Sequence, residues 1–425
     1  MPTKVLRSRK SCNQDIFRMA APSTRHSGIV STNMNTRVLG PGRFYGGAPM
    51  GLEGWIGLIK PDDLRIRTRA VLVVLIGWVP LVVLAGFQDF FSGGNALSSL
   101  LLDFGSLARY LVAAPLLVLA ERTCFPRFES IILHFRDSGL IAGRDSERYE
   151  SIVRSSSGLL TSKVAEILCF VIAYAITAYC IVAVPANSLI SWSYVSGSAG
   201  ASLSLAGTWH ALVTAPFLLV LVLGWVWRQF SWARFLWLVS RLDLQLLPTH
   251  PDLCGGLKFV ATMTHAYRPI GFAFTAIVAG GIANRMVHSG AHLMSYRDLM
   301  IGVTLFVGLF CLAPLTVFAP VLRRLRGKAI FEYGRLARNV GDVLGQKWLT
   351  RLENIQPDVL DAPDFSATTD LYSIVANVYK IAHLPVSFAA FRELLIFMAL
   401  PFVPVLLLAA PVKAVFEALV RVAIS

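Results

Sequence analysis

Charged side chains are scarce in this sequence. Asp, Glu, Lys and Arg make up 15% of the 425 residues and hydrophobic residues make up 55%, whereas an ordinary soluble domain carries roughly 25% charged residues. A soluble chain of this composition would expose large apolar patches to water. The low charge content therefore argues against a soluble globular protein and favours a chain that folds in a lipid bilayer.

Motifs for catalysis, cofactors and metals are also lacking. The sequence contains no H-E-x-x-H, no phosphate-binding loop with a lysine and no G-x-S-x-G, which are signatures of metalloproteases, nucleotide hydrolases and serine hydrolases. Its last apolar run contains no lysine for a retinal Schiff base, and its six cysteines show no paired spacing. We therefore predict no catalytic residues, no metal and no cofactor, and an enzyme is the least favoured class.

Residues 1–50 contain no apolar run, so they lack the apolar core of a secretory signal. They are rich in Ser, Thr, Asn, Gly and Arg, a composition that cannot bury enough apolar surface to fold. We predict a disordered basic tail over residues 1–50, followed by a helical transmembrane domain over residues 51–425.

Long apolar runs dominate the sequence from residue 70 onwards. A membrane-crossing helix needs about 20 mostly apolar residues, and about seven runs approach this length. They lie near residues 70–87, 107–120, 164–184, 209–230, 269–283, 299–322 and 394–410. The sequence therefore predicts an all-α polytopic membrane bundle of about seven transmembrane helices.

Two long polar segments, residues 121–163 and 323–392, separate some of these runs. In the first, apolar residues recur from Phe128 to Phe135 at helical spacing, which predicts amphipathic helices lying on the membrane face. In the second, Leu336, Val340 and Leu344 predict an amphipathic helix that continues the sixth span.

The basic residues are distributed unevenly along the chain. Thirty-three of the 39 lysines and arginines fall in residues 1–69, 121–163, 228–258 and 323–392. Because basic residues concentrate in cytoplasmic loops, this asymmetry predicts a multi-pass protein of the cell (inner) membrane with its N-terminus in the cytoplasm. The net charge of +14 then fits contact with anionic lipid headgroups, and no nucleic acid is expected as a partner.

The stretch from His250 to Arg268 combines helix breakers, an acid, paired glycines and basic residues. If a helix begins near Gly255, then Lys258, His265 and Arg268 share one face, and the glycines allow an anionic group to approach closely. We predict a cytoplasm-facing anionic site here, formed by Lys258, His265, Arg268, Asp252, Gly255 and Gly256. The alternative is a capped inter-helix turn whose arginine reaches the headgroup layer.

The same stretch carries a resemblance. His250-Pro-Asp-x-x-Gly-Gly-Leu-x-Phe259 resembles a motif of uncharacterised bacterial multi-pass inner-membrane proteins, a domain of unknown function. The proline-interrupted last span is similar too, although Cys254 stands where those proteins often have glycine. The resemblance implies a bacterial membrane protein and no particular activity.

Two functional classes remain open. The prolines at the start of the fifth span and within the seventh, together with the polar stretch, favour a transporter or channel-like protein. The large basic cytoplasmic segments instead favour a membrane scaffold or signalling partner. Such a protein would bind a second copy of itself or an unidentified protein partner. A water-filled cavity between the spans is expected only in the first class.

Overall fold

The computed structural model describes residues 44–59, 63–183, 191–197, 200–349 and 364–409. Seven helices within these residues are long and apolar enough to cross a membrane. The seven spans, numbered in chain order, cover Ile66–Ser92, Phe104–Asp137, Gly143–Ala183, Leu205–Val239, Arg268–Ser289, Leu293–Trp348 and Phe388–Leu408. The predicted all-α class with seven spans is confirmed, and the protein is a multi-pass helical membrane protein.

Spans 1 and 2 are connected by a short helix. Span 1 comprises α2 (Ile66–Gly77) and α3 (Val79–Ser92), α4 covers Ala96–Leu101, and span 2 comprises α5 (Phe104–Leu107), the π-helix η1 (Ala108–Ala113), α6 (Ala114–Leu119) and α7 (Glu121–Asp137). Asp103 begins α5 by accepting the N–H groups of Gly105 and Ser106. This carboxylate satisfies two of the backbone donors that every helix N-terminus leaves free.

Spans 3 and 4 pack against each other and are linked by two strands. Span 3 comprises η2 (Gly143–Asp145), α8 (Ser146–Leu160) and α9 (Lys163–Ala183), the antiparallel strands are β1 (Tyr194–Gly197) and β2 (Gly200–Leu203), and span 4 comprises α10 (Leu205–Trp209), the π-helix η5 (His210–Thr214) and α11 (Ala215–Val239). The strands form the only sheet among the described residues. They leave the all-α character of the fold unchanged.

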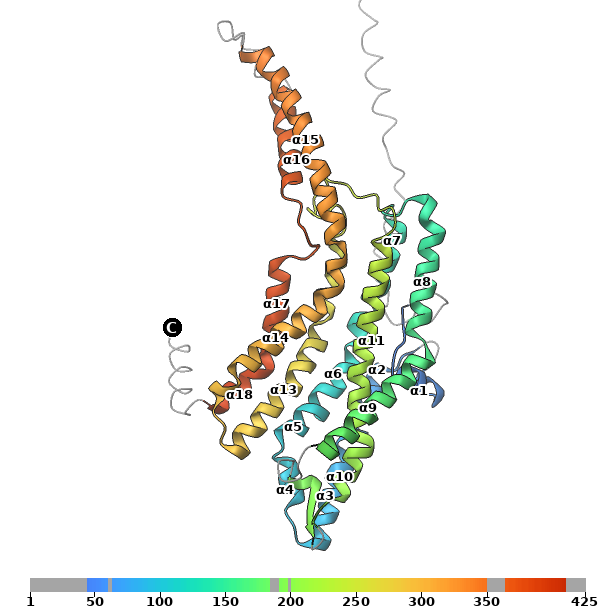
Figure 1. The fold of residues 1–425 in the computed structure, drawn as a ribbon, viewed down its shortest axis with the longest axis vertical. Helices are drawn as coiled ribbons and strands as arrows, with labels where there is room; N and C mark the ends of the chain where they lie inside the picture. Colours follow the sequence, from blue (N-terminus) through green and yellow to red (C-terminus); the bar gives the residue numbers. More distant parts are fainter. Residues whose placement is uncertain (1–43, 60–62, 184–190, 198–199, 350–363, 410–425) are drawn as a thin grey trace, which may run out of the picture.

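Helices α7 and α8 differ from the arrangement predicted for residues 121–163. Instead of lying on the membrane face, α7 continues span 2, α8 leads into span 3, and both stand alongside α11 (Figure 1). Tyr149, Ile152 and Val153 of α8 are buried, and α8 packs on α11. The apolar stripe thus covers protein rather than lipid, a distinction that helical periodicity cannot make because both surfaces require the same spacing.

Spans 5 to 7 pack together on one flank of span 2 (Figure 1). They comprise α13 (Arg268–Ser289), then η7 (Leu293–Tyr296), α14 (Arg297–Leu312), η8 (Ala313–Phe318) and α15 (Ala319–Trp348), and finally α17 (Phe388–Ala399), η11 (Leu400–Phe402) and α18 (Val403–Ala409). A Cβ atom on Gly271 would overlap Met398 of α17, and one on Gly280 would lie 2.8 Å from the carbonyl oxygen of Phe104. These glycines therefore allow α13 to sit closely between spans 2 and 7.

Helix α15 continues well beyond the bilayer. The sixth span covers 56 residues, about 84 Å of helix at roughly 1.5 Å per residue, whereas the hydrocarbon core is about 30 Å thick. The outer part of α15 projects from the bundle with α16 (Asp364–Tyr379) packed along it (Figure 1). Gly341 permits this contact, since a Cβ atom there would lie 2.7 Å from the Tyr372 hydroxyl.

Residues 44–50 belong to the core, so the prediction of a disordered tail is wrong for them. Phe44 is 1% exposed, and its ring packs against Phe128, Trp232 and Phe235 at centroid distances of 5.3–6.0 Å. Helix α1 (Met50–Trp55) follows directly. Two adjacent aromatic residues among glycines have no periodicity to reveal the burial of Phe44. Residues 1–43 of the predicted tail lie outside the described residues.

Candidate functional site

The turn between spans 4 and 5 is organised around Asp252. Its carboxylate accepts the backbone N–H groups of Cys254 at 2.8 Å, Gly256 at 3.1 Å and Lys258 at 3.0 Å. Burial favours the neutral acid, but these hydrogen bonds and the one from His250 outweigh burial, so the pKa of Asp252 lies below its ordinary value. The Asp252 carboxylate is therefore committed to the turn itself.

The two glycines shape this turn. Gly255 and Gly256 have φ values of 66° and 96°, in the left-handed region that glycine adopts without steric cost. A Cβ atom on Gly255 would also lie 2.7 Å from Leu325 of α15. The predicted α-helix from Gly255 does not form: a 3₁₀-helix, η6 (Lys258–Thr262), and the one-turn α12 (Met263–Ala266) precede α13 instead.

His265 and Arg268 meet at the start of α13. The Arg268 guanidinium lies 2.7 Å from Nδ1 of His265 and 2.5 Å from a carboxylate oxygen of Glu393 in α17. It also lies over the Phe397 ring, 4.7 Å from the centroid. Glu393 itself was missed, although its spacing of four from Phe397 places both on one face of α17.

The predicted site residues thus form two groups. Asp252, Gly255, Gly256 and the backbone N–H of Lys258 build the turn, whereas His265 and Arg268 form a separate cluster with Glu393. The side chain of Lys258 is exposed.

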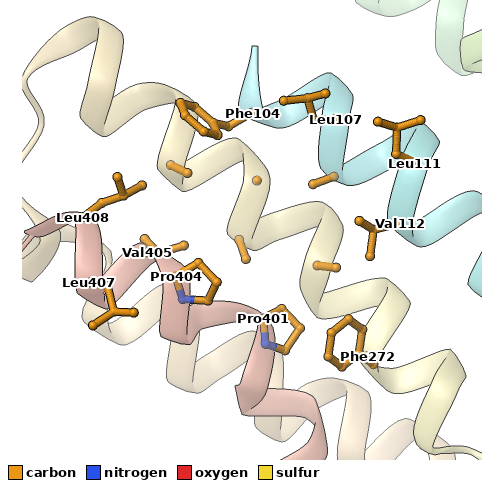
Figure 2. Close-up of a pocket in the computed structure, with 15 residues that line it drawn as sticks. Phe104, Leu107, Leu111, Val112, Phe272, Pro401, Pro404, Val405, Leu407 and Leu408 are labelled. Carbon is orange, nitrogen blue, oxygen red and sulfur yellow. The ribbon is translucent and has the colours of Figure 1, made fainter. Parts of the chain in front are cut away.

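A large apolar groove lies between spans 2, 5 and 7 (Figure 2). Its volume is about 630 Å³, and fifteen residues line it: Phe104, Leu107, Ala108, Leu111, Val112, Phe272, Ala276, Ala279, Gly280, Ala283, Pro401, Pro404, Val405, Leu407 and Leu408. None of these side chains is polar. Small residues of α13 form the floor, and larger residues of spans 2 and 7 form the walls. Ligand pockets for small molecules have volumes of this order.

The groove ends one helical turn from the Arg268 cluster. Phe272 lines the groove and follows Arg268 by four residues on α13, while Pro401 lines the groove and follows Phe397 by four residues in span 7. Residues four apart lie on the same face of a helix, about 6 Å apart along its axis. The partly exposed guanidinium of Arg268, the imidazole of His265 and the carboxylate of Glu393 therefore lie at one end of the apolar groove.

Four ionisable side chains form a second cluster, deep in the bundle. Arg69 of span 1 pairs with Glu53 of α1 and, at 2.5 Å, with Glu121 of span 2, and Arg228 of span 4 lies 3.0 Å from Glu121. All four are at most 5% exposed. Burial raises the pKa of Glu53, and the attraction of Arg69 lowers it only in part.

This network holds the N-terminal segment in the bundle. Arg228 donates hydrogen bonds to the carbonyl oxygens of Gly46 at 2.8 Å and Gly47 at 3.4 Å, and Glu166 of α9 accepts the N–H of Leu52 at 2.9 Å. Two arginines and two glutamates cancel in charge, which is the condition under which buried ions are tolerated. The basic-residue asymmetry places Arg69 and Arg228 on the predicted cytoplasmic side, but nothing in the spacing of the sequence relates them to Glu53 and Glu121.

His210 near the start of span 4 and His288 near the end of span 5 lie in different surroundings. His210 contacts Tyr110, and His288 contacts the carbonyl oxygen of Asn284 on its own helix. Within the described residues, no group of three or more His, Cys, Asp or Glu side chains is placed to hold a metal ion.

Comparisons with known proteins do not identify a relative. No protein-family model matches the chain, and neither a curated protein nor a solved structure matches it. The structure by itself establishes the class: seven apolar helices long enough to cross a bilayer, packed around small residues and a neutral buried ion network. The chain is a multi-pass helical membrane protein.

Proposed function

We propose that this protein binds an anionic amphiphile from the bilayer and acts as a transporter-like protein. In this proposal an acyl or similar apolar chain occupies the groove on α13, and the anionic headgroup contacts His265, Arg268 and the exposed Lys258. The observation that carries the proposal is the fully apolar groove ending one turn from the Arg268 cluster. The predicted rim residues Asp252, Gly255 and Gly256 shape the turn that precedes this cluster.

Selectivity in this proposal comes from the headgroup. An apolar chain that moves from lipid into a protein groove gains little, because lipid is already an apolar solvent. The headgroup, in contrast, competes with Glu393 for Arg268, since both offer oxygen acceptors to the same guanidinium. In the ligand-free protein, Glu393 thus occupies the place of the headgroup at Arg268, and a bound headgroup must displace it.

A photoactivatable phosphatidylglycerol in nanodiscs of phosphatidylcholine tests the proposal. We expect cross-links to the walls of the groove, and we expect Arg268→Gln to reduce them at least tenfold. A tenfold change corresponds to about 1.4 kcal/mol, and a hydrogen bond to a charged group contributes about 1.5–3 kcal/mol. Glu393→Gln is expected to increase them, because it frees the guanidinium. Arg297→Gln, in an exposed pair with Asp298, is the matched control. Equal labelling by a phosphatidylcholine probe with the same chain contradicts the proposal.

The side of the membrane is part of the same proposal. The basic-residue asymmetry supports a cytoplasmic location for the N-terminus, the Arg268 cluster and the α15–α16 pair. The motif around His250–Phe259 supports a bacterial inner membrane and the uncharacterised family named above.

A second candidate function rests on the projecting helices. Three apolar side chains are 64–80% exposed: Phe331 and Val343 of α15, and Leu349 directly after it. They lie on a helix pair that stands clear of the bundle (Figure 1). Such side chains support a scaffold that binds a protein partner or a second copy. Cross-linking through Val343→Cys tests it, and the absence of any adduct in native membranes argues for the first candidate alone.

A further inference from the structure

A third polar cluster lies where two π-helices meet, at the end of the bundle away from the Arg268 cluster. The π-helices η1 and η5 are the only ones among the described residues, and they are joined by a contact of 3.3 Å between the Tyr110 hydroxyl and Nδ1 of His210. A π-helix is rare, carries strained hydrogen bonding and often marks a functional site. Two of them meeting at one titratable pair call for an explanation beyond packing.

The surroundings of His210 are polar and closely fixed. Its ring lies 5.5 Å from the Trp192 ring, whose Nε1 donates to Asp103 at 3.0 Å. Asp103 also accepts the Ser106 hydroxyl at 2.6 Å and two backbone N–H groups. Other groups around the pair have partners of their own: Arg109 donates to the Gly105 carbonyl oxygen and the Ser106 hydroxyl, and Tyr174 of span 3 donates to the Leu212 carbonyl oxygen. Asp89 of α3, a helix that packs on α10, accepts the N–H groups of Ala96 and Leu97.

The π-helix of span 2 connects this cluster to the groove. Ala108, Leu111 and Val112 of η1 line the groove wall, while Tyr110 of the same segment is 2% exposed and faces His210. Any change in the winding of η1 therefore moves the groove wall and the Tyr110 hydroxyl together. The Thr214 hydroxyl in η5 is buried without a hydrogen-bond partner among the described residues, so η5 holds an unsatisfied polar group as well.

We propose that His210 and Tyr110 form a proton-binding pair that controls the shape of the α13 groove. The inference rests on the proposed amphiphile site and assigns its regulation. In the tautomer of neutral His210 whose Nδ1 is unprotonated, Nδ1 accepts the proton of the buried Tyr110 hydroxyl. When His210 takes a proton from solvent at Nδ1, both ring nitrogens become donors, and Tyr110 must accept instead.

This exchange leaves the hydroxyl proton of Tyr110 without an acceptor. Leaving a buried donor unsatisfied costs about 1–3 kcal/mol, and the π-helix offers a way to relieve that cost. Moving its extra residue by one position rewinds η1 towards α-helix, turns Tyr110 away from His210 and shifts Ala108, Leu111 and Val112. His210 lies five residues after the start of span 4 at Leu205, about 8 Å into the helix, so protons reach it from that side of the membrane.

Spin-label distances measured on the full chain in nanodiscs test the proposal. Labels at Leu102→Cys and Val287→Cys, both exposed and outside the groove, report span 2 against α13 on a background without native cysteines. Between pH 8 and pH 4 we expect a shift of about 1–2 Å, the scale of known helix adjustments. His210→Gln and Tyr110→Phe are expected to abolish it. His288→Gln, at an exposed histidine, is expected to retain it.

A second measurement separates this proposal from the amphiphile site. Binding of the phosphatidylglycerol probe should change at least about fivefold between the two pH values, as typical coupled sites do, and remain constant in His210→Gln. A pH-dependent distance without probe binding refutes the amphiphile site alone. Probe binding with no pH-dependent distance, or a shift that persists in His210→Gln, overturns the proton-binding pair.

Discussion

At the scale of single residues, the buried ion network determines how the bundle closes at one end. Arg228 contributes to it three times over: it pairs with Glu121, it donates to two backbone carbonyl oxygens of the N-terminal segment, and its guanidinium lies 4.8 Å from the Trp225 ring centroid. Each of these contacts depends on a charge that is out of reach of water. Removal of Arg228 therefore leaves an uncompensated negative charge buried in the network.

We predict that Arg228→Met destabilises the protein by about 3–5 kcal/mol, the cost of breaking a buried pair. Arg136→Met is the matched control, because Arg136 pairs with Glu150 at the surface, with its side chain 43% exposed. Such surface pairs contribute about 0–1 kcal/mol. Equilibrium unfolding in detergent compares the two variants. Equal losses of stability contradict the assigned role of the network.

The residue scale is also where sequence analysis was least informative. The spacing of Lys258, His265 and Arg268 suggested one polar stripe, yet positive φ angles at Gly255 and Gly256 turn the chain before a helix can form. Glu393 and Glu121 lie 125 and 107 residues from Arg268 and Arg228. No local pattern relates side chains so far apart, so these pairs become visible only in three dimensions.

At the scale of helices, small residues decide which spans touch. Gly280 and Gly281 are neighbours on α13, but only Gly280 faces span 2, where a Cβ atom would meet Ala108 and the Phe104 carbonyl oxygen. Nothing lies within 4 Å of a Cβ atom on Gly281. Comparing the same substitution at the two glycines therefore distinguishes the effect of packing from that of helix propensity, since both positions are helical and lie in the same span.

We predict that Gly280→Ala destabilises the protein and that Gly281→Ala does not. Alanine improves helix propensity by up to about 1 kcal/mol at either position, but at Gly280 it must push α13 away from span 2, and overpacking typically costs about 1–3 kcal/mol. Thermal unfolding in detergent measures both variants. If Gly280→Ala is as stable as Gly281→Ala, the close contact between the two spans does not limit stability.

Span number and class were predictable because bilayer thickness imposes a length on every apolar run. The π-helices η1 and η5 were not, because an extra residue in a helical turn changes neither the composition nor the apolar run around it. The upright position of α7 and α8 was missed for a related reason. Their apolar stripe fits a membrane surface and a protein surface equally well.

At the scale of the whole molecule, the two ends differ in size. One end extends through α7, α8 and the α15–α16 pair, whereas the other consists of α3, α4, α10 and the short strands (Figure 1). The larger end carries most of the basic residues. The end of a membrane protein that stays in the cytoplasm, where the chain is synthesised, can be large. The end that must be moved across the membrane is expected to be small.

We predict that cysteines at Ser151 and Ser289 label from opposite sides of the membrane. Both positions are exposed, and they lie on α8 and at the end of α13. In intact cells an impermeant maleimide should react with Ser289→Cys and reach Ser151→Cys only after permeabilisation, on a background without native cysteines. The reverse pattern inverts the proposed orientation.

The position of Arg228 in the chain has a consequence for biosynthesis. Glu53, Arg69 and Glu121 leave the ribosome early, whereas Arg228 follows Glu121 by 107 residues. Until span 4 is made, the three early residues carry a net negative charge, and the carbonyl oxygens of Gly46 and Gly47 lack their donor. The N-terminal segment can therefore settle only after four spans have been inserted. Nascent chains that stop before span 4 should keep this segment open to proteases, which makes its docking a late checkpoint of membrane assembly.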